Sequence, residues 1–218
     1  MPVSLHVDDI ERLDQIIQRG KPLQKGEYLF RANDPFTSVY AVRSGAVKTV
    51  TLSDNGNEQI TGFYLPGEVL GMDGLATNLH SNSVIALETS SVCEIPFHRL
   101  EELSGQLPSL QRHFLQLMSR EITQEQQMIS LLNKNNAESR VASMLLSISA
   151  RNASRQLSAK NFILPMSRTD LGNFLGLTIE TVSRTFARLQ QNNLLTVNKK
   201  EIIINDVAAL QQLAKGQD

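Results

Sequence analysis

The chain has 218 residues, enough for one or two domains with cores of ordinary size. Hydrophobic residues make up 41% of it and charged residues 20%, as is typical of globular proteins, and no apolar run approaches the ~20 residues of a membrane span. The single cysteine excludes an internal disulfide and fits a reducing compartment, so we expect a cytoplasmic protein with no membrane partner.

The charge is distributed unevenly along the chain. Its net value is −1, but residues 1–133 hold 10 Lys and Arg against 16 Asp and Glu, whereas residues 134–200 hold 10 against 3. A basic segment of this kind is the electrostatic footprint of nucleic-acid binding. The alternative is a basic solvated face without a partner.

Residues 7–19 are predicted to form an amphipathic helix that Gly20 ends, because apolar residues recur there at helical spacing. Over residues 22–97 the hydrophobic period changes to two, and turn residues separate short alternating runs. Residues 54–57 (Asp-Asn-Gly-Asn) are a strong hairpin signal. The segment is predicted to be an antiparallel β-roll or barrel of about eight strands.

A long helix is expected from residue 108 to about residue 133, with apolar residues at a 3-4-3-4-3 spacing. This spacing is typical of a coiled-coil seam, so we expect two copies of the helix to pair in a homodimer. Packing of the stripe on the chain's own β-roll is the alternative. The predicted dimer interface comprises Leu115, Met118, Ile122, Glu125, Ile129 and Leu132.

Glu125 is the charged member of this seam. Two-fold symmetry would bring two Glu125 carboxylates together, and like charges at short range in a partly dry interface are costly. We hypothesise that Glu125 keeps the dimer near its dissociation threshold and so makes association switchable.

The segment 164–188 is predicted to be a helix, a turn and a second helix. Ser167 can cap the first helix, Gly176 breaks it, and Thr178 can cap the second. Gly172 leaves room for the two helices to cross closely. This order is typical of a helix-turn-helix. The apolar residues expected on its inner faces are Leu171, Phe174, Leu175, Val182, Phe186 and Leu189.

Glu180, Ser183 and Arg184 share the face of the second helix that lies opposite the apolar one. Arg is the usual bidentate partner of guanine, Glu accepts from cytosine N4, and Ser adapts to either edge. The alternative, favoured for the helix considered alone, is that Glu180 and Arg184 form an ordinary i,i+4 surface pair. The glycine turn before this helix and a hairpin after it favour DNA reading.

That hairpin is predicted from two alternating runs, residues 194–197 and 202–204, which form a small two-stranded wing. Lys199 and Lys200 at its tip can contact phosphates, although lysine at a turn is commonly only solvated. The other elements predicted near it are a helix over 137–150, a loop or frayed end over 151–162 and a closing helix over 207–213.

These elements give an α+β chain with an N-terminal antiparallel β-roll domain at 1–107, a dimerisation helix at 108–135 and a winged helix-turn-helix at 136–218. This arrangement resembles the CRP/FNR family of bacterial transcription regulators over the whole chain. The resemblance implies that the β-roll is a sensory domain of the cyclic-nucleotide-binding kind. Residues 179–184 (Ile-Glu-Thr-Val-Ser-Arg) resemble the recognition helix of the FNR branch. In the CRP branch, Arg replaces Ile179 and Gly replaces Ser183.

The resemblance implies a DNA-binding regulator rather than an enzyme, with double-stranded DNA, a second copy of the chain and RNA polymerase as partners. It implies palindromic sites with TTGAT half-sites, read by Glu180, Ser183 and Arg184, and Ile179 could touch a thymine methyl. Further residues implied at the DNA are Thr178, Arg168, Lys199 and Lys200.

The resemblance also bears on what the β-roll senses. In the cyclic-nucleotide branch an Arg-Ser pair binds the phosphate, whereas here no Lys or Arg occurs between Lys48 and Arg99. The matching stretch is residues 81–84 (Ser-Asn-Ser-Val), which offers no cation to a phosphodiester. Cyclic nucleotide is therefore not expected as a ligand.

FNR-branch proteins carry an oxygen-labile [4Fe-4S] cluster that promotes dimerisation, held by three cysteines of an N-terminal extension and a fourth in a Val-Cys-Glu-Ile-Pro motif. Cys93, within residues 92–96, matches the fourth, although a lone cysteine in an alternating strand is most often a small core residue. Such a cluster requires four thiolates. The chain as given is therefore not expected to bind one, and we interpret it as a shortened FNR-type protein.

Two other readings remain open. One is a CRP-like regulator that senses a different small molecule in the β-roll. The other is a cupin-like metal enzyme, which clustered histidines and a carboxylate would favour. This reading is disfavoured because no H-x-H pair occurs among the scattered His6, His80, His98 and His113.

Overall fold

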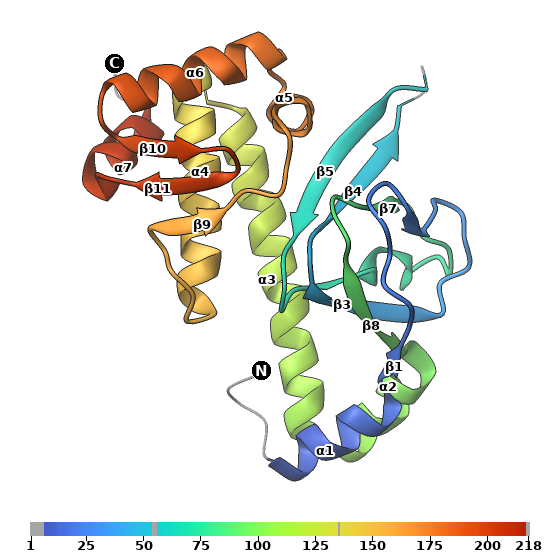
Figure 1. Ribbon diagram of the computed structural model, residues 1–218. Helices are drawn as coiled ribbons and strands as arrows, with labels where there is room; N and C mark the ends of the chain where they lie inside the picture. The colour runs from blue at the N-terminus through green and yellow to red at the C-terminus, as the bar shows by residue number, and fades with distance from the viewer. Residues whose placement is uncertain (1–6, 54–55, 135, 217–218) are drawn as a thin grey trace. The chain divides into compact units, whose positions relative to one another are not determined.

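The computed structural model describes residues 7–53, 56–134 and 136–216, and the chain divides into two compact units, residues 1–123 and 124–218 (Figure 1). The division falls inside the long helix that the sequence indicates as a separate segment. The α+β class is confirmed, with a sheet-rich first unit and a helix-turn-helix in the second. In the described part of the chain, no helix is both long and apolar enough to cross a membrane.

The first unit begins with helix α1 (Val7–Ile16) and strand β1 (Gln18–Arg19). The prediction of one helix over 7–19 is wrong at its end, because the backbone of β1 pairs antiparallel with Cys93 and Glu94 of a later strand. Edge pairing satisfies the backbone of these residues in place of another helical turn.

Two four-stranded antiparallel sheets form the β-roll, as predicted. The first has the order β1-β8-β3-β6 and the second the order β2-β7-β4-β5. Between β4 and β5, Gly56 donates its N–H to the carbonyl of Ser53, and the two strands form the predicted hairpin, whose residues 54 and 55 lie outside the described residues. The strands after β1 are β2 (Tyr28–Phe30), β3 (Ser38–Ser44), β4 (Val47–Leu52), β5 (Glu58–Tyr64), β6 (Val69–Leu70), β7 (Ser83–Ala86) and β8 (Ser91–Pro96).

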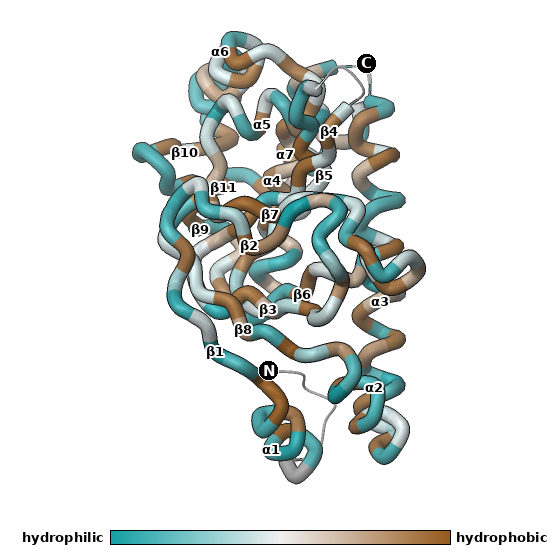
Figure 2. Tube along the Cα trace, turned by 90° about the vertical axis from the view of Figure 1, so that its right-hand side faces the viewer, coloured by the Kyte–Doolittle hydropathy of each residue, from teal (hydrophilic) through white to brown (hydrophobic). Residues whose placement is uncertain are grey.

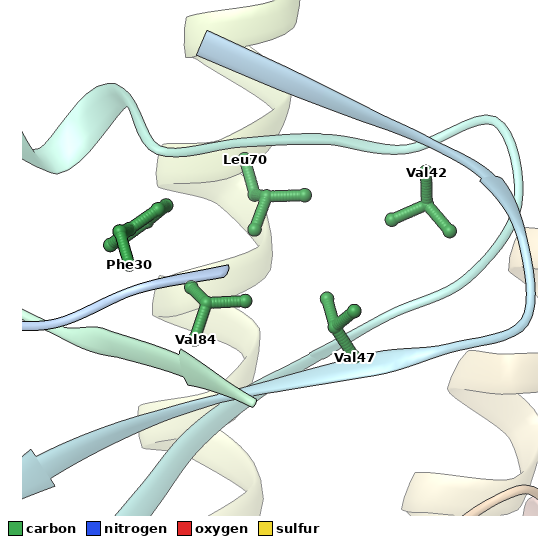
Figure 3. Packing of buried hydrophobic residues seen from close by; sticks show 5 residues of the cluster. All are labelled: Phe30, Val42, Val47, Leu70 and Val84. Atoms are coloured by element: carbon green, nitrogen blue, oxygen red, sulfur yellow. The ribbon is translucent and has the colours of Figure 1, made fainter. Parts of the chain in front are cut away.

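The core of the roll lies between the two sheets. Figure 3 shows that its side chains point toward one another from both sides. Val42 and Leu70 come from the first sheet, and Phe30, Val47 and Val84 come from the second. Burying each such side chain stabilises the fold by roughly 1.5–3 kcal/mol, so this cluster holds the sheets face to face.

Two helices follow the roll, α2 (Phe97–Gln106) and α3 (Pro108–Leu132). Helix α2 is absent from the sequence prediction, although Leu100 and Leu103 pack into a second apolar cluster of the first unit. Pro108 suits the first position of α3, where a helix does not use the missing N–H.

The second unit contains a winged helix-turn-helix. Its wing has three strands in the order β10-β11-β9 rather than the two predicted. The predicted loop over 151–162 is wrong at both ends, since α4 continues to Ser154 and Asn161 starts β9. The elements are α4 (Ala137–Ser154), β9 (Asn161–Ile163), α5 (Arg168–Leu175), α6 (Ile179–Gln191), β10 (Leu195–Asn198), β11 (Glu201–Ile204) and α7 (Val207–Lys215).

The crossing of α5 and α6 gives a stability prediction. A Cβ atom on Gly172 would lie 2.7 Å from the carbonyl oxygen of Leu177, closer than real Cβ atoms approach backbone. Gly172→Ala should therefore destabilise the protein by roughly 1–3 kcal/mol, through overpacking against a turn that cannot shift without moving α6. Urea unfolding followed by circular dichroism at 222 nm measures this change.

The matched control is Thr169→Ala on the same helix, where an exposed side chain is removed. Its effect should stay within about 0.5 kcal/mol. Equal stability of the two variants would contradict a close helix crossing at Gly172.

Candidate nucleic-acid interface

Helix α5 begins with a complete capping box. The Ser167 hydroxyl accepts from the Asp170 N–H at 3.0 Å, and the Asp170 carboxylate accepts from the Ser167 N–H at 3.0 Å. This reciprocal pair satisfies two free donors of the first turn and fixes where the helix starts. At the other end, Gly176 has φ +64°, the left-handed conformation that ends a helix and turns the chain into α6.

Helix α6 has one buried face and one exposed face. Thr178 caps it by accepting from the Thr181 N–H at 3.2 Å. Val182, Phe186 and Leu189 are buried. These contacts fix the rotation of α6 about its own axis, because turning the helix would expose the apolar residues.

The three predicted base readers lie together on the exposed face. Glu180, Ser183 and Arg184 are all exposed, at the spacing i, i+3 and i+4. In the described residues, no ion pair within 4 Å joins Glu180 to Arg184, so the predicted i,i+4 surface pair is not formed. The guanidinium, hydroxyl and carboxylate groups of these three residues can form hydrogen bonds with DNA bases.

The helix terminus holds Glu180 in its ionised form. Its own backbone N–H, then the Thr178 hydroxyl, and then the charge of Arg184 lower the pKa of the Glu180 carboxyl below its usual value. At neutral pH this residue is therefore a hydrogen-bond acceptor only.

Two other predicted residues flank this edge. Ile179 is 46% exposed at the start of α6, next to the exposed Thr178. Arg168 lies half-buried with its guanidinium carbon 3.3 Å from the centre of the Phe186 ring, and burial lowers the pKa of Arg168. This stacking orients Arg168 and ties the start of α5 to the buried face of α6.

The two wing lysines differ in their surroundings. Lys199 is exposed at the tip between β10 and β11, with φ +55°. Lys200 is also exposed, but its ammonium donates to the carbonyl of Pro165 at 3.4 Å.

Beside the predicted edge lies a hollow that the sequence analysis missed. It has a volume of about 390 Å³ and lies between the start of α4 and α6. Arg188 forms an ion pair with Glu138 across it. The spacing of Arg188, one turn after Arg184, is the sequence signal for a second arginine on this side of α6. The lining residues are Asn136, Ala137, Glu138, Thr181, Arg184, Thr185 and Arg188.

The predicted dimer seam is largely exposed on α3. Leu115 is 60% exposed, Ile122 55% and Ile129 62%, while Leu132 and Glu125 are also exposed and Met118 is half-buried. Figure 2 shows apolar residues recurring along α3 between polar ones. Of the seam residues in the first unit, Leu115 and Ile122 are more than half exposed and Met118 is half-buried, so the choice between pairing with a second copy and packing on the chain's own β-roll stays a prediction.

Cys93 lies half-buried in β8, opposite Ala41 and Arg19 in the neighbouring strands. In the part of the chain that the structure describes, no three His, Cys, Asp or Glu side chains gather where they could hold a metal ion. A [4Fe-4S] cluster takes four thiolates, and the sequence has one cysteine. The residues of this chain do not by themselves fit the cluster.

Two family models match the chain. A cyclic nucleotide-binding domain matches residues 21–106, and a Crp-like helix-turn-helix domain matches residues 139–213. Transcriptional activator protein anr of Pseudomonas aeruginosa is 55% identical over 217 residues, covering 100% of this chain and 89% of the relative. The fumarate and nitrate reduction regulatory protein of Yersinia pestis is 48% identical over 214 residues, covering 98% and 86%.

A solved structure agrees with these relatives. FixK2 from Bradyrhizobium japonicum has a TM-score of 0.81 and 30% identity, covering 91% of this chain and 97% of that chain. Identity of about one half over the full chain, with both domain models matched in order, shows that this chain belongs to the CRP/FNR family of transcription regulators.

Proposed function

We propose that this chain is a sequence-specific DNA-binding transcription regulator of the FNR type, which acts in the cytoplasm as a homodimer. The observation that carries this proposal is the division of α6 into a buried apolar face and an exposed edge of Glu180, Ser183 and Arg184. A helix held in this way can enter a major groove with the edge facing the bases.

The chemistry of the edge indicates which bases it reads. The Arg184 guanidinium can donate two parallel hydrogen bonds to guanine O6 and N7, and the ionised Glu180 can accept from cytosine N4. Ser183 lies between them and can donate or accept. TTGAT half-sites contain a G·C pair that suits these groups, so we propose them as the target.

The names of the relatives indicate which physiological process this chain would regulate. Among them are an anaerobic regulatory protein of Pasteurella multocida, 49% identical, and the activator anr and the fumarate and nitrate reduction regulator described above. We extend their role to this chain as control of transcription in response to anaerobiosis, through contact with RNA polymerase.

The dimer follows from the exposed seam of α3. Leu115, Ile122 and Ile129 lie at the coiled-coil spacing with more than half of each side chain exposed. A second copy of α3 would bury both stripes and, by two-fold symmetry, present two recognition helices to a palindromic site. Glu125 lies between Ile122 and Ile129, so pairing would bring two carboxylates together and reduce the affinity of the dimer.

We also propose that the response to oxygen acts through an iron-sulfur cluster. Cys93 is the ligand that this chain would contribute, and a bound [4Fe-4S] cluster would supply an oxygen-labile group. The sequence holds no further cysteine, and neither the edge of α6 nor the seam of α3 includes Cys93.

The base-reading role predicts the effect of Arg184→Ala. This change should weaken binding to a TTGAT palindrome by roughly 1–3 kcal/mol and relax the preference at one guanine, because the bidentate donor is lost. Binding titrations against the palindrome and against variants of that guanine measure both effects.

The control is Lys199→Ala. It should weaken binding to all sequences alike and reduce the slope of log K against log salt by about one. If Arg184→Ala bound every site as tightly as its parent, the base-reading role would be wrong.

The seam predicts that Glu125→Ala tightens the dimer, by roughly tenfold, because repulsion between two carboxylates disappears. Analytical ultracentrifugation over a concentration series measures the dissociation constant. The control is Gln127→Ala, two residues on and about 200° around the helix, which should leave the constant unchanged. An unchanged constant for Glu125→Ala would remove the proposed role of Glu125.

The cysteine count predicts the outcome of cluster reconstitution. Incubation of the 218-residue chain with ferrous iron and sulfide under anaerobic conditions should leave no stable cluster, because Cys93 supplies one of four thiolates. Iron and sulfide analysis after desalting, with Cys93→Ser as the matched control, tests this. Near-stoichiometric cluster in the parent chain would contradict the expectation that one thiolate is too few.

A further inference from the structure

A loop of the first unit gathers five hydrogen-bond donors around one carboxylate. The short 3₁₀ helix Met72–Gly74 carries Asp73, and the loop lies just before β7. The Asp73 Oδ2 atom accepts from the backbone N–H groups of Ser81 at 2.8 Å and Asn82 at 3.0 Å. It also accepts from the Ser81 hydroxyl at 3.0 Å and the Asn82 side-chain amide at 3.3 Å. The Asp73 Oδ1 atom lies 3.1 Å from Nδ1 of His80.

The fifth donor, His80, is held rigidly. His80 is 2% exposed, its ring stacks on Phe30 with centroids 3.7 Å apart, and the Phe36 ring is steeply inclined to it with centroids 5.6 Å apart. An ionised carboxylate only accepts hydrogen bonds, so the contact with Asp73 places the proton on Nδ1 of His80. The donor thus has a fixed position and a fixed direction.

The Asp73 carboxylate is ionised in this setting. Burial alone would raise the pKa of Asp73, but the hydrogen bonds from His80, Ser81 and Asn82 outweigh it and hold the pKa below its usual value. The negative charge is therefore stabilised by the loop itself.

Consecutive backbone N–H groups that converge with a hydroxyl, an amide and an imidazole form a site of the kind that holds oxyanions in proteins. No Lys or Arg occurs between residues 48 and 99, so the donors act through hydrogen bonds rather than through a formal positive charge from those two residue types. The loop lies within the segment that matches a cyclic nucleotide-binding domain. In this loop the anion that accepts the hydrogen bonds is the carboxylate of Asp73, a residue of the chain itself.

We propose that residues 80–82 form an oxyanion-binding loop that the Asp73 carboxylate fills from within the chain. The loop keeps the shape of an occupied site without any ligand, and it is closed to external carboxylates and phosphates. Asp73 is seven to nine residues from its donors, so its effective concentration at the site exceeds that of free anions in solution. An external anion would also have to displace an ionised, multiply hydrogen-bonded group.

The test is chemical rescue of Asp73→Ala in the full chain. Removing the carboxylate leaves five aligned donors around a small space, which acetate or inorganic phosphate can enter. Thermal unfolding is measured in sodium chloride, sodium acetate and sodium phosphate at equal ionic strength and pH. All three tyrosines of the sequence lie in the first unit, so tyrosine fluorescence reports the unfolding of that unit.

We expect Asp73→Ala to unfold at a lower temperature than the parent in chloride. Acetate or phosphate should then raise its midpoint by about 3–6 °C at ten times the dissociation constant, whereas the parent should show no such increase over chloride. The acetate and phosphate arms decide whether the open loop prefers a planar carboxylate or a tetrahedral anion.

The matched control is Asp73→Asn. Its amide fills the same space, so this variant should be destabilised but should not respond to either anion. If Asp73→Ala does not fold in chloride, the yield of folded protein after refolding in acetate, relative to chloride, becomes the measured quantity. Equal anion responses of parent, Asp73→Ala and Asp73→Asn, or no response of Asp73→Ala, would overturn the proposal and leave Asp73 as a structural link within the loop.

Discussion

The burial of one face of α6 is the constraint on which the DNA-binding surface depends. Val182, Phe186 and Leu189 are fixed in the core of the second unit, and each residue of a helix turns it by about 100°. Once those three are buried, the positions of Ser183 and Arg184 on the outer face follow. Gly172 adds to this constraint, because its missing Cβ lets the turn at Leu177 approach α5 closely. The polar edge is thus positioned by apolar contacts on the opposite face of α6.

In the β-roll, apolar packing likewise positions a polar cluster, here the hydrogen-bond donors around the Asp73 carboxylate. Its two sheets close over an apolar core, and a loop outside this core turns its donors toward Asp73 rather than toward solvent. The Phe30 ring belongs both to the core and to the stack on His80, so the packing of the sheets also orients a donor of the loop. Rigid apolar packing and a satisfied polar cluster therefore stabilise the same part of the first unit.

Much of this architecture could be predicted from the sequence, because it depends on local patterns. A few neighbouring residues are enough to recognise each pattern: the hydrophobic period of two in the roll, the helix-ending glycine at 176 and the apolar stripe of α6. Strands β1 and β9 were missed because two or three residues carry no period, and their partners lie far along the chain. The Arg188–Glu138 ion pair joins side chains 50 positions apart. The donors around Asp73 lie nearby in sequence, but only a folded loop brings them together.

The long helix α3 carries the seam through which we propose that two copies of the chain pair. Its exposed seam passes from the first unit into the second, so pairing of two chains would engage residues on both sides of the division. Within the first unit, the hydroxyl of Tyr64 at the end of β5 donates to Glu121, the residue before Ile122 of the seam. This contact joins the end of β5 to α3 one residue before Ile122. The β-roll and the part of α3 that carries Leu115, Met118 and Ile122 therefore belong to one compact unit.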